Sequence, residues 1–367
     1  MEIGVLGIGK LGLCFALNIE RKGGSIIGVD VNKQYTEALN QKTFHSFEPQ
    51  VNELLAASKH FRATTEIKEV LTDTIELLFV MVATPSTAEG SYDHSQIEHI
   101  AEQLVAFGKR NKTTALVIGC TTMPGYCDDL AQRLAPYNYT VSYNPEFIAQ
   151  GNIIYGQQFP DQVLIGESDE RTGDLIQSVY ETMCENKPIF CRMNRLSAEI
   201  CKIATNCFLT TKISFANSIG DLAVKVGAEP DKILQAIGAD SRIGPKYLGY
   251  GFGFGGPCFP RDNRALGLFA RTNDYELLIS NATDEVNHRH LEFQFQQYLQ
   301  KYDASEQIVF DGVTYKRGSV MLDESQQLAL AVKLAKAGRK VLLRDQQVVL
   351  DEVQKLYGNI FEYEAVV

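Results

Sequence analysis

Short apolar runs alternate with amphipathic stretches over the first half of the chain. The stretches predict helices, of which three are clear, at 11–21, 97–107 and 175–183. The runs predict strands, at 3–6, 26–29, 77–82, 115–119, 139–142 and 162–165. Because this alternation is typical of strand–helix–strand units with right-handed crossovers, we expect residues 1–193 to form an α/β domain with an N-terminal Rossmann-type, doubly wound parallel sheet.

The pattern changes at residue 194, where a helical stretch begins that runs to residue 226 without proline and with Gly220 as its only glycine. A stretch this apolar needs another helix to cover it. We therefore expect residues 194–300 to form a central long-helix layer that serves for dimerisation and catalysis, interrupted by the glycine-rich loop 249–256. The apolar residues expected at the homodimer surface are Ile203, Phe208, Ile213, Phe215 and Ile219.

Residues 301–367 repeat the α/β texture in a shorter form. Strands are predicted at 308–310 and 341–343, on either side of a helix at 325–337. This short C-terminal α/β fragment can bury its apolar faces only by docking on other parts of the protein.

Length and charge limit the possible partners. A chain of 367 residues has room for two or three domains of about 150 residues each. Its 35 basic and 45 acidic side chains leave a net charge of −10, which disfavours nucleic acid and anionic membranes. The chain opens without a basic segment, and apolar runs such as 77–83 are too short to span a bilayer. We expect a cytoplasmic protein with neither a nucleic-acid nor a membrane partner.

Cysteine and histidine spacing gives no indication of a metal site. The eight cysteines include no C-x-x-C pair, and the close pair His288 and His290 has no cysteine cluster nearby. No metal and no disulfide framework is predicted.

The first candidate site is Gly7-Ile8-Gly9-Lys10-Leu11-Gly12, which fits G-x-G-x-x-G between the first strand and the first helix. Gly7 permits the turn, Gly9 lets a pyrophosphate approach the backbone, and Gly12 lets helix and strand pack. Asp30 ends the next strand, where a carboxylate binds ribose hydroxyls and repels a 2′-phosphate. The set predicts NAD binding in preference to NADP; a tight turn without a ligand is the alternative.

A second candidate is the segment from Gly253 to Asp262, which contains Cys258. The glycines expose backbone to a substrate, and a polar, partly exposed loop suits a nucleophilic thiolate. On spacing alone, a structural cysteine in a turn fits equally well.

The third candidate is the pair Lys202 and Asn206, one helical turn apart in an otherwise apolar stretch. Two polar groups aimed at one point would stabilise a developing alkoxide or oxyanion. The spacing by itself favours a simpler interpretation, a solvated helix face with an extended lysine.

Together with four further motifs, these residues resemble the nucleotide-sugar 6-dehydrogenase family, best known from UDP-glucose 6-dehydrogenase, over nearly the whole chain. The further motifs are Thr84-Pro85, Thr121-Thr122-Met123-Pro124, Asn144-Pro145-Glu146-Phe147 and Arg242-Ile243-Gly244. The resemblance implies a four-electron oxidation of a sugar primary alcohol to the uronate with two NAD in turn, UDP-glucose being the first candidate substrate.

The resemblance also implies roles for single residues. Cys258 would carry a thiohemiacetal and then a thioester, which water hydrolyses. Lys202 and Asn206 would offset negative charge on oxygen, while Asp262, Glu146 and Thr122 would act on the water. The implied cofactor contacts are Gly7, Gly9, Lys10, Leu11, Gly12, Asp30, Thr84, Pro85 and Thr122. The implied substrate contacts are Phe147, Lys202, Asn206, Arg242, Tyr247, Leu248, Gly255 and Lys316, with Arg242 reaching the substrate of the partner subunit.

Three departures from the family pattern shape the alternatives. Gln150 stands where the family commonly has Glu, Asp323 stands where an arginine is expected, and the family's C-terminal domain is usually larger than the 66 residues after Lys301. We expect normal NAD binding but weak binding of the sugar nucleotide, unless a partner chain completes the pocket. The alternatives are a catalytically impaired NAD-binding homologue, a dehydrogenase acting on GDP-mannose or another UDP-hexose, and a two-electron hydroxyacid dehydrogenase. Pro257 disfavours N-acetylmannosamine nucleotides, whose enzymes usually carry His there.

Overall fold

The computed structural model describes residues 2–148 and 151–366, so Gln150 and the departure predicted there lie outside the described residues. The chain divides into two compact units, residues 1–202 and 203–367. The division into three domains, with boundaries at 193 and 300, stays a prediction.

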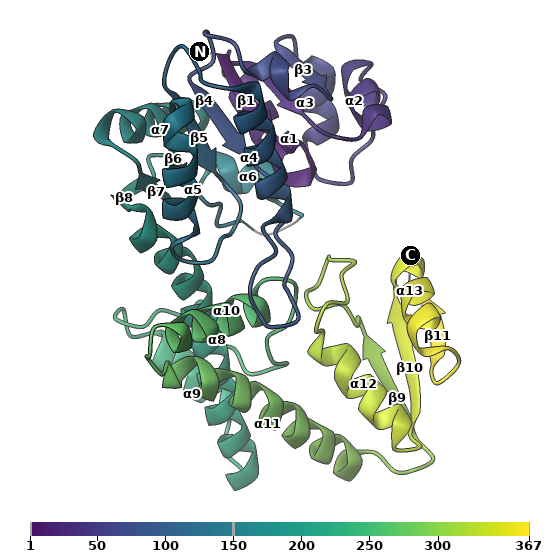
Figure 1. Ribbon diagram of the computed structural model, residues 1–367. Coiled ribbons are helices and arrows are strands. Elements are labelled where there is room, and N and C mark those ends of the chain that lie inside the picture. Colours follow the sequence, from purple (N-terminus) through teal and green to yellow (C-terminus); the bar gives the residue numbers. More distant parts are fainter. Residues whose placement is uncertain (1, 149–150, 367) are drawn as a thin grey trace. The chain divides into compact units, whose positions relative to one another are not determined.

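The first unit is built on an eight-stranded sheet in the order β3-β2-β1-β4-β5-β6-β7-β8 (Figure 1). Its strands are β1 (Glu2–Leu6), β2 (Ser25–Val29), β3 (Phe61–Thr64), β4 (Leu77–Val80), β5 (Thr114–Ile118), β6 (Tyr139–Tyr143), β7 (Gln162–Glu167) and β8 (Ile189–Asn194). Its helices are α1 (Lys10–Glu20), α2 (Lys33–Asn40), α3 (Val51–Ala57), α4 (Ser95–Phe107), α5 (Tyr126–Leu134), α6 (Ile153–Gln158) and α7 (Glu170–Met183), with short 3₁₀ turns η1 (Ile67–Val70) and η2 (Ala135–Tyr137). The predicted α/β fold with a Rossmann-type sheet is confirmed.

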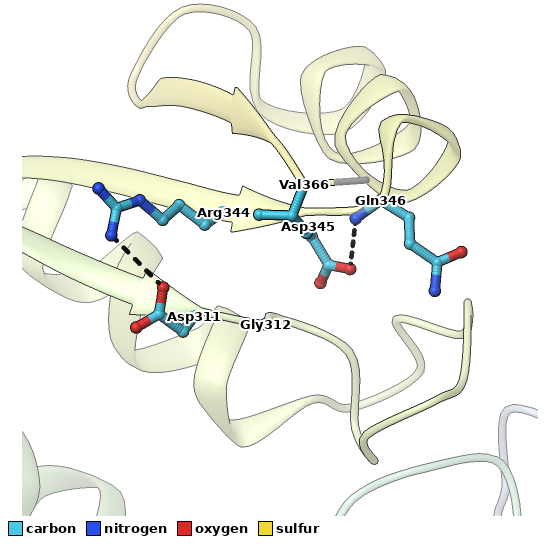
Figure 2. Close-up of a pocket in the computed structure, with 6 residues that line it drawn as sticks. All are labelled: Asp311, Gly312, Arg344, Asp345, Gln346 and Val366. Atoms are coloured by element: carbon cyan, nitrogen blue, oxygen red, sulfur yellow. Dashed lines mark hydrogen bonds and ion pairs between the residues drawn. The ribbon is translucent and has the colours of Figure 1, made fainter.

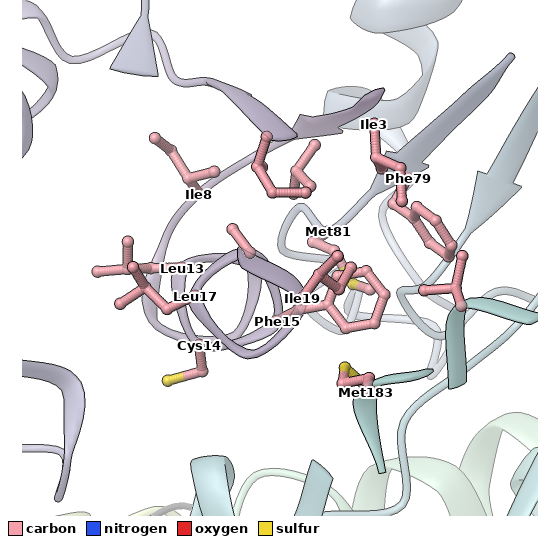
Figure 3. Packing of buried hydrophobic residues seen from close by; sticks show 14 of the residues in the cluster. Ile3, Ile8, Leu13, Cys14, Phe15, Leu17, Ile19, Phe79, Met81 and Met183 are labelled. Carbon is pink, nitrogen blue, oxygen red and sulfur yellow. The ribbon is translucent and has the colours of Figure 1, made fainter. Parts of the chain in front are cut away.

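Both faces of this sheet are buried, because strand side chains alternate between two apolar clusters. In β4, Phe79 joins the cluster under α1, α3, α6 and α7, while Leu78 and Val80 join the cluster under α4 and α5. The Phe15 ring of α1 lies 4.7 Å from the Phe79 ring, centroid to centroid. Figure 3 shows this packing beside the glycine-rich loop. Helices on both faces are what the doubly wound arrangement requires.

The prediction of an entirely parallel sheet was wrong at one pairing. β6 and β7 run antiparallel, meeting at Tyr143 and Gly166, whereas every other pairing described in this sheet is parallel. The helix between them, α6, has six residues and is therefore about 9 Å long, shorter than the crossover helix that usually joins two parallel strands. Strand direction is set by that connection, and hydrophobic periodicity does not encode it.

Helix α8 (Arg195–Val226) runs from the first unit into the second, and the second unit contains two kinds of structure. Three further helices are α9 (Pro230–Gly238), α10 (Phe259–Thr272) and α11 (Leu278–Lys301). A three-stranded parallel sheet in the order β11-β10-β9 is formed by β9 (Gln307–Asp311), β10 (Lys340–Asp345) and β11 (Glu362–Ala365), with α12 (Gln326–Lys336) and α13 (Gln347–Tyr357). The core of this C-terminal part includes Phe310, Leu334 and Leu343, and residues of α11 pack against it.

Candidate active site

Five parallel strands of the first unit end at one edge of the sheet. The residues at or just beyond these strand ends are Gly7 after β1, Asp30 after β2, Thr84 after β4, Thr122 after β5 and Glu146 after β6. The strand order reverses between β1 and β4, because β2 and β3 extend to one side and β5 and β6 to the other. Open α/β sheets bind ligands at such a switch point, outside the carboxyl ends of the strands.

The glycine-rich loop has the local geometry that a dinucleotide needs. Gly7 has a φ of +87°, and its N–H donates to the Val29 carbonyl at 2.8 Å. A Cβ on Gly12 would lie 2.0 Å from the Gly7 oxygen, so no other residue fits there without movement. A Cβ on Gly9 would meet nothing within 4 Å, and no side chain caps α1 at Gly9. The start of α1 therefore offers open space and backbone N–H groups to a phosphate.

Asp30 and Tyr35 shape the ribose side of this loop. Asp30 is half-buried and accepts a backbone hydrogen bond from Asn32 N to Oδ1 at 3.0 Å. The Tyr35 hydroxyl donates to the Ile8 carbonyl at 2.7 Å and so ties α2 to the loop. Burial, with the nearby Asp30 charge, raises the pKa of Tyr35 and keeps this donor protonated. Sequence reasoning missed Tyr35, since an aromatic residue in a short amphipathic helix gives no distinct signal.

The remaining predicted cofactor residues lie around the same edge. Thr84 is buried, while Pro85 is exposed and its carbonyl accepts the Asp93 N–H at 2.8 Å. Lys10 is exposed and Leu11 is half-buried at the start of α1. Of the predicted set, Gly12, Thr84 and Thr122 are buried, and the other residues are exposed or half-buried beside the strand ends.

Glu146 and Lys202 are joined through the backbone. The Lys202 ammonium donates to the Glu146 carbonyl at 2.7 Å and lies 4.3 Å from the centroid of the Phe147 ring. Lys202 is buried, so it does not lie on the solvated helix face that its spacing alone favoured. Burial raises the pKa of the Glu146 carboxyl to about 7, against the lowering effects of Lys202, Gln157 and Tyr180. A carboxyl group with this pKa can exchange a proton near neutral pH.

Thr122 is fully buried, and its hydroxyl donates to Glu199 Oε1 at 2.8 Å. Glu199, on α8 one turn before Lys202, also accepts the N–H groups of Gly125 at 2.7 Å and Cys127 at 2.9 Å. These bonds hold the start of α5 against α8. Burial raises the pKa of Glu199. Sequence reasoning missed this glutamate, because one acidic residue in a long helix is more typical of a solvated face.

In the second unit, Asn206, Asp262 and Cys258 come together. Asn206 Nδ2 donates to Asp262 Oδ2 at 2.6 Å, and Arg261 Nε lies 3.2 Å from Asp262 Oδ1. Asp262 is 1% exposed, and both the Asn206 amide and the Arg261 guanidinium stabilise its carboxylate. Cys258 is exposed and forms the N-cap of α10, and its carbonyl accepts the Asp262 N–H at 2.8 Å. A helix N-terminus stabilises negative charge on a thiolate.

The predicted substrate residues of the second unit differ in how exposed they are. Arg242 is exposed and bound to Asp240 through Nη2 at 2.6 Å, while Tyr247 and Lys316 are exposed. Leu248 is buried in a small cluster with Ala216 and Leu234. Gly255 is buried as well, and a Cβ on it would lie 2.3 Å from the Glu324 carbonyl oxygen.

Asp323 takes part in the same loop through its backbone. Its carbonyl accepts the Gly256 N–H at 2.8 Å, two residues before Cys258. The residue that departs from the family pattern therefore still supports the cysteine loop.

An open, mostly parallel sheet with a glycine-rich loop and an acidic residue at its switch point defines a dinucleotide-binding dehydrogenase type of domain. The comparisons with known proteins agree. The NAD binding domain of the UDP-glucose/GDP-mannose dehydrogenase family matches residues 1–184, and the central domain of that family matches residues 196–289. The chain therefore belongs to the UDP-glucose/GDP-mannose dehydrogenase family. It is an NAD-dependent oxidoreductase of the nucleotide-sugar dehydrogenase class, as the motifs predicted.

Individual relatives are similar over most of their length. A UDP-glucose 6-dehydrogenase of Pseudomonas aeruginosa is 30% identical over 362 residues, covering 94% of this chain and 79% of the relative. A GDP-mannose 6-dehydrogenase of Pseudomonas syringae pv. syringae is 29% identical, covering 99% and 84%. The structure of a UDP-glucose dehydrogenase from Pyrobaculum islandicum superimposes with a TM-score of 0.87 at 28% identity, covering 99% of this chain and 85% of that one. No helix in the described residues is long and apolar enough to cross a membrane.

Proposed function

We propose that this protein oxidises C6 of UDP-glucose from the primary alcohol to the carboxylate. The alcohol loses one hydride to NAD to give an aldehyde, and the aldehyde level loses a second hydride to a second NAD. One water is consumed, and two NADH and three protons are released. The UDP-glucose dehydrogenases of Pseudomonas aeruginosa and Pyrobaculum islandicum support this choice of substrate.

The observation that carries the proposal is the exposed thiol of Cys258 at the start of α10, one turn before Asp262 of the Asn206–Asp262 pair. In the proposed reaction the sulfur adds to the aldehyde carbon, and the carbonyl oxygen takes a proton, giving a thiohemiacetal. Loss of hydride and of that proton gives a thioester. Water then cleaves the C–S bond, releasing the acid and returning the thiol. A two-electron dehydrogenase leaves this cysteine without a role.

The other polar groups have distinct proposed tasks. Lys202 and Asn206 offset negative charge that develops on the substrate oxygen. Glu146, whose pKa is raised to about 7, and Asp262 position and deprotonate water. We propose that Thr122 also positions this water. Its hydrogen bond to Glu199 supports this proposal, because it holds the hydroxyl in one orientation.

The proposed binding residues fall into two groups, one for NAD and one for the substrate. We assign NAD contacts to the glycine-rich loop, to Asp30 and to the strand-end residues; they are Gly7, Gly9, Lys10, Leu11, Gly12, Asp30, Thr84, Pro85 and Thr122. We assign substrate contacts to Phe147, Lys202, Asn206, Arg242, Tyr247, Leu248, Gly255 and Lys316. The ion pair of Arg242 with Asp240 would have to exchange for a substrate contact.

GDP-mannose is the second candidate substrate, favoured by the GDP-mannose 6-dehydrogenase of Pseudomonas syringae. The deciding experiment measures NADH released per sugar with limiting UDP-glucose, GDP-mannose and other UDP-hexoses. Two NADH per sugar is the expected result, and the sugar that gives it identifies the substrate. One NADH per sugar would indicate a two-electron dehydrogenase, and none with any sugar would indicate an impaired homologue.

We also propose that the protein is a cytoplasmic homodimer, since NAD and nucleotide sugars are cytoplasmic metabolites. Phe208, Phe215 and Leu222 of α8 are 65%, 46% and 58% exposed and recur every seven residues, so they line one face of the helix. Burying such a face in a second copy removes apolar surface from water. Ile203, by contrast, is buried within its own chain. Sedimentation velocity is expected to give a dimer, and a stable active monomer would contradict the proposal.

A further inference from the structure

A buried histidine, His290 of α11, has a hydrogen-bond acceptor at each ring nitrogen. Its Nδ1 lies 2.9 Å from both carboxylate oxygens of Asp221 on α8, and its Nε2 lies 2.6 Å from the Gly251 carbonyl oxygen. The side chain is 1% exposed. A carbonyl and a carboxylate both accept hydrogen bonds, so the ring bridges two acceptors. His290 therefore joins Asp221 of α8 to the Gly251 backbone inside the second unit.

Asp221 and His290 both contact the loop 249–256, which precedes Cys258. The Tyr250 hydroxyl donates to Asp221 Oδ1 at 2.9 Å, and burial, together with Asp221, raises the pKa of Tyr250 so that it stays a donor. The Tyr250 ring lies against α8 where Gly220 leaves room, since a Cβ on Gly220 would be 2.0 Å from the ring. Gln294 Nε2 also donates to the Gly251 carbonyl, at 3.0 Å. The loop is thus held to α8 and α11 at Tyr250 and Gly251.

Neutral side chains hold the rest of the loop. Asn217 accepts the Gly251 N–H at 3.1 Å and donates to the Phe252 carbonyl at 3.3 Å. Asn287 makes two 2.9 Å bonds with the N–H and carbonyl of Phe254. Together with the bond from Gly256 to Asp323, these contacts define the backbone from Gly251 almost to Cys258. Among them, the Asp221–His290 pair links both α8 and α11 to the loop.

We propose that His290 is a positioning residue for Cys258, an inference that rests on the proposed function. It does not act on substrate. Its hydrogen bond to the Gly251 carbonyl, held in direction by Asp221, sets where the loop leaves the helices and therefore where the cysteine sulfur meets the aldehyde carbon. Hydride loss from the alcohol does not involve the sulfur. Displacing the loop should therefore slow the thiol-dependent second oxidation more than the first.

The test compares His290→Gln, Asp221→Asn and the double variant with wild type, and uses His288→Gln as control. His288 is exposed on the same helix and is two residues away. In single-turnover NADH formation with UDP-glucose, each single variant is expected to slow the second oxidation about tenfold and the first far less. In the double variant, the Gln and Asn side chains can again bond Gly251 and each other, so this variant is expected to recover most of the second-step rate. The control should match wild type.

A second readout does not depend on turnover. Iodoacetamide alkylation of Cys258, followed by mass spectrometry, is expected to slow about threefold in the single variants, because a displaced sulfur loses part of the stabilisation at the α10 N-terminus. Melting temperatures identify any variant that merely unfolds. Equal loss in both oxidation steps, or wild-type rates of second oxidation in folded His290→Gln, would overturn the proposal. If wild type releases no NADH with any sugar, the proposed function fails, and the alkylation rates alone decide the role of His290.

Discussion

Two strand–helix–strand units of this protein share a backbone arrangement, but the aspartates at the ends of their second strands make different contacts. In the first, β1 leads through α1 to β2 and Asp30; in the second, β9 leads through α12 to β10 and Asp345. The glycine after each first strand has a positive φ, +87° at Gly7 and +92° at Gly312. Each glycine N–H donates at 2.8 Å to the residue before the aspartate.

The two aspartates are used differently. Asp345 is 8% exposed, and its carboxylate accepts the N–H of Val313 at 2.9 Å and of Gln346 at 2.7 Å; Figure 2 shows the second of these bonds. Asp30 is half-buried and accepts the N–H of Asn32. Helix α1 begins at Lys10, close behind its glycine, whereas the loop 313–325 separates Gly312 from α12.

This difference teaches that the backbone plan alone does not make a dinucleotide site. A helix N-terminus must follow the glycine directly, so that backbone N–H groups reach the phosphates. The carboxylate at the end of the second strand must also keep acceptor capacity for a ribose. Asp345 accepts two N–H groups from its own connecting segments, and these bonds stabilise the fold.

The largest effect is expected at Gly12. In Gly12→Ala the new Cβ collides with the Gly7 carbonyl, so we expect a loss of about 3 kcal/mol or more in the free energy of unfolding, and loss of NAD binding. Urea unfolding and NAD titration measure the two. Gly9→Ala is the matched variant, because its Cβ meets no protein atom: it should keep the stability and lose NAD affinity. Normal NAD binding by Gly9→Ala would remove that glycine from the phosphate site.

Asp345→Asn should destabilise the second unit without touching the cofactor. One of the two backbone donors loses its acceptor in a buried place, which costs about 2 kcal/mol. Urea unfolding is expected to reveal this loss, while NAD affinity stays at the wild-type value. The control is Asp311→Asn, an exposed neighbour, which should leave the stability unchanged. A fall in NAD affinity for Asp345→Asn would break the comparison between the two units.

Asp30→Ala should give the smallest change in stability and a selective change in binding. We expect NAD affinity to fall about tenfold and the preference for NAD over NADP to shrink, because the repulsion of a 2′-phosphate is removed. Calorimetric titration with NAD and NADP measures both affinities, and the exposed Glu37→Ala variant is the control. Equal affinities of wild type for NAD and NADP would show that Asp30 does not set the preference.

Features with a local cause were predictable from the sequence. The glycine-rich loop and Asp30 could be predicted because each glycine meets a local steric need and the acid follows a strand end. The long helix α8 was predictable within one residue, since its apolar pattern is unbroken by proline. Lys202 and Cys258 became candidate site residues through their motifs, because spacing alone favoured a structural role for the first and left the second open.

Features that depend on distant contacts were not predictable. Glu199 and His290 are ordinary polar residues of amphipathic helices until the fold brings Thr122 to one and Gly251 to the other. The reversed direction of β7 depends on how a connection packs. Asp345, likewise, looks like Asp30 in sequence, and only its bonds to Val313 and Gln346 distinguish the two.

The central claim, a thioester route through Cys258, is tested most directly by the products of Cys258→Ser. A serine hydroxyl ionises far less readily and would form an ester that resists hydrolysis. Mass spectrometry of the sugar products and of the intact protein after incubation with UDP-glucose and NAD is the measurement. We predict NADH from the alcohol step, no free uronate above background, and any trapped sugar attached to the introduced serine. Normal release of uronate by the serine variant would contradict the account.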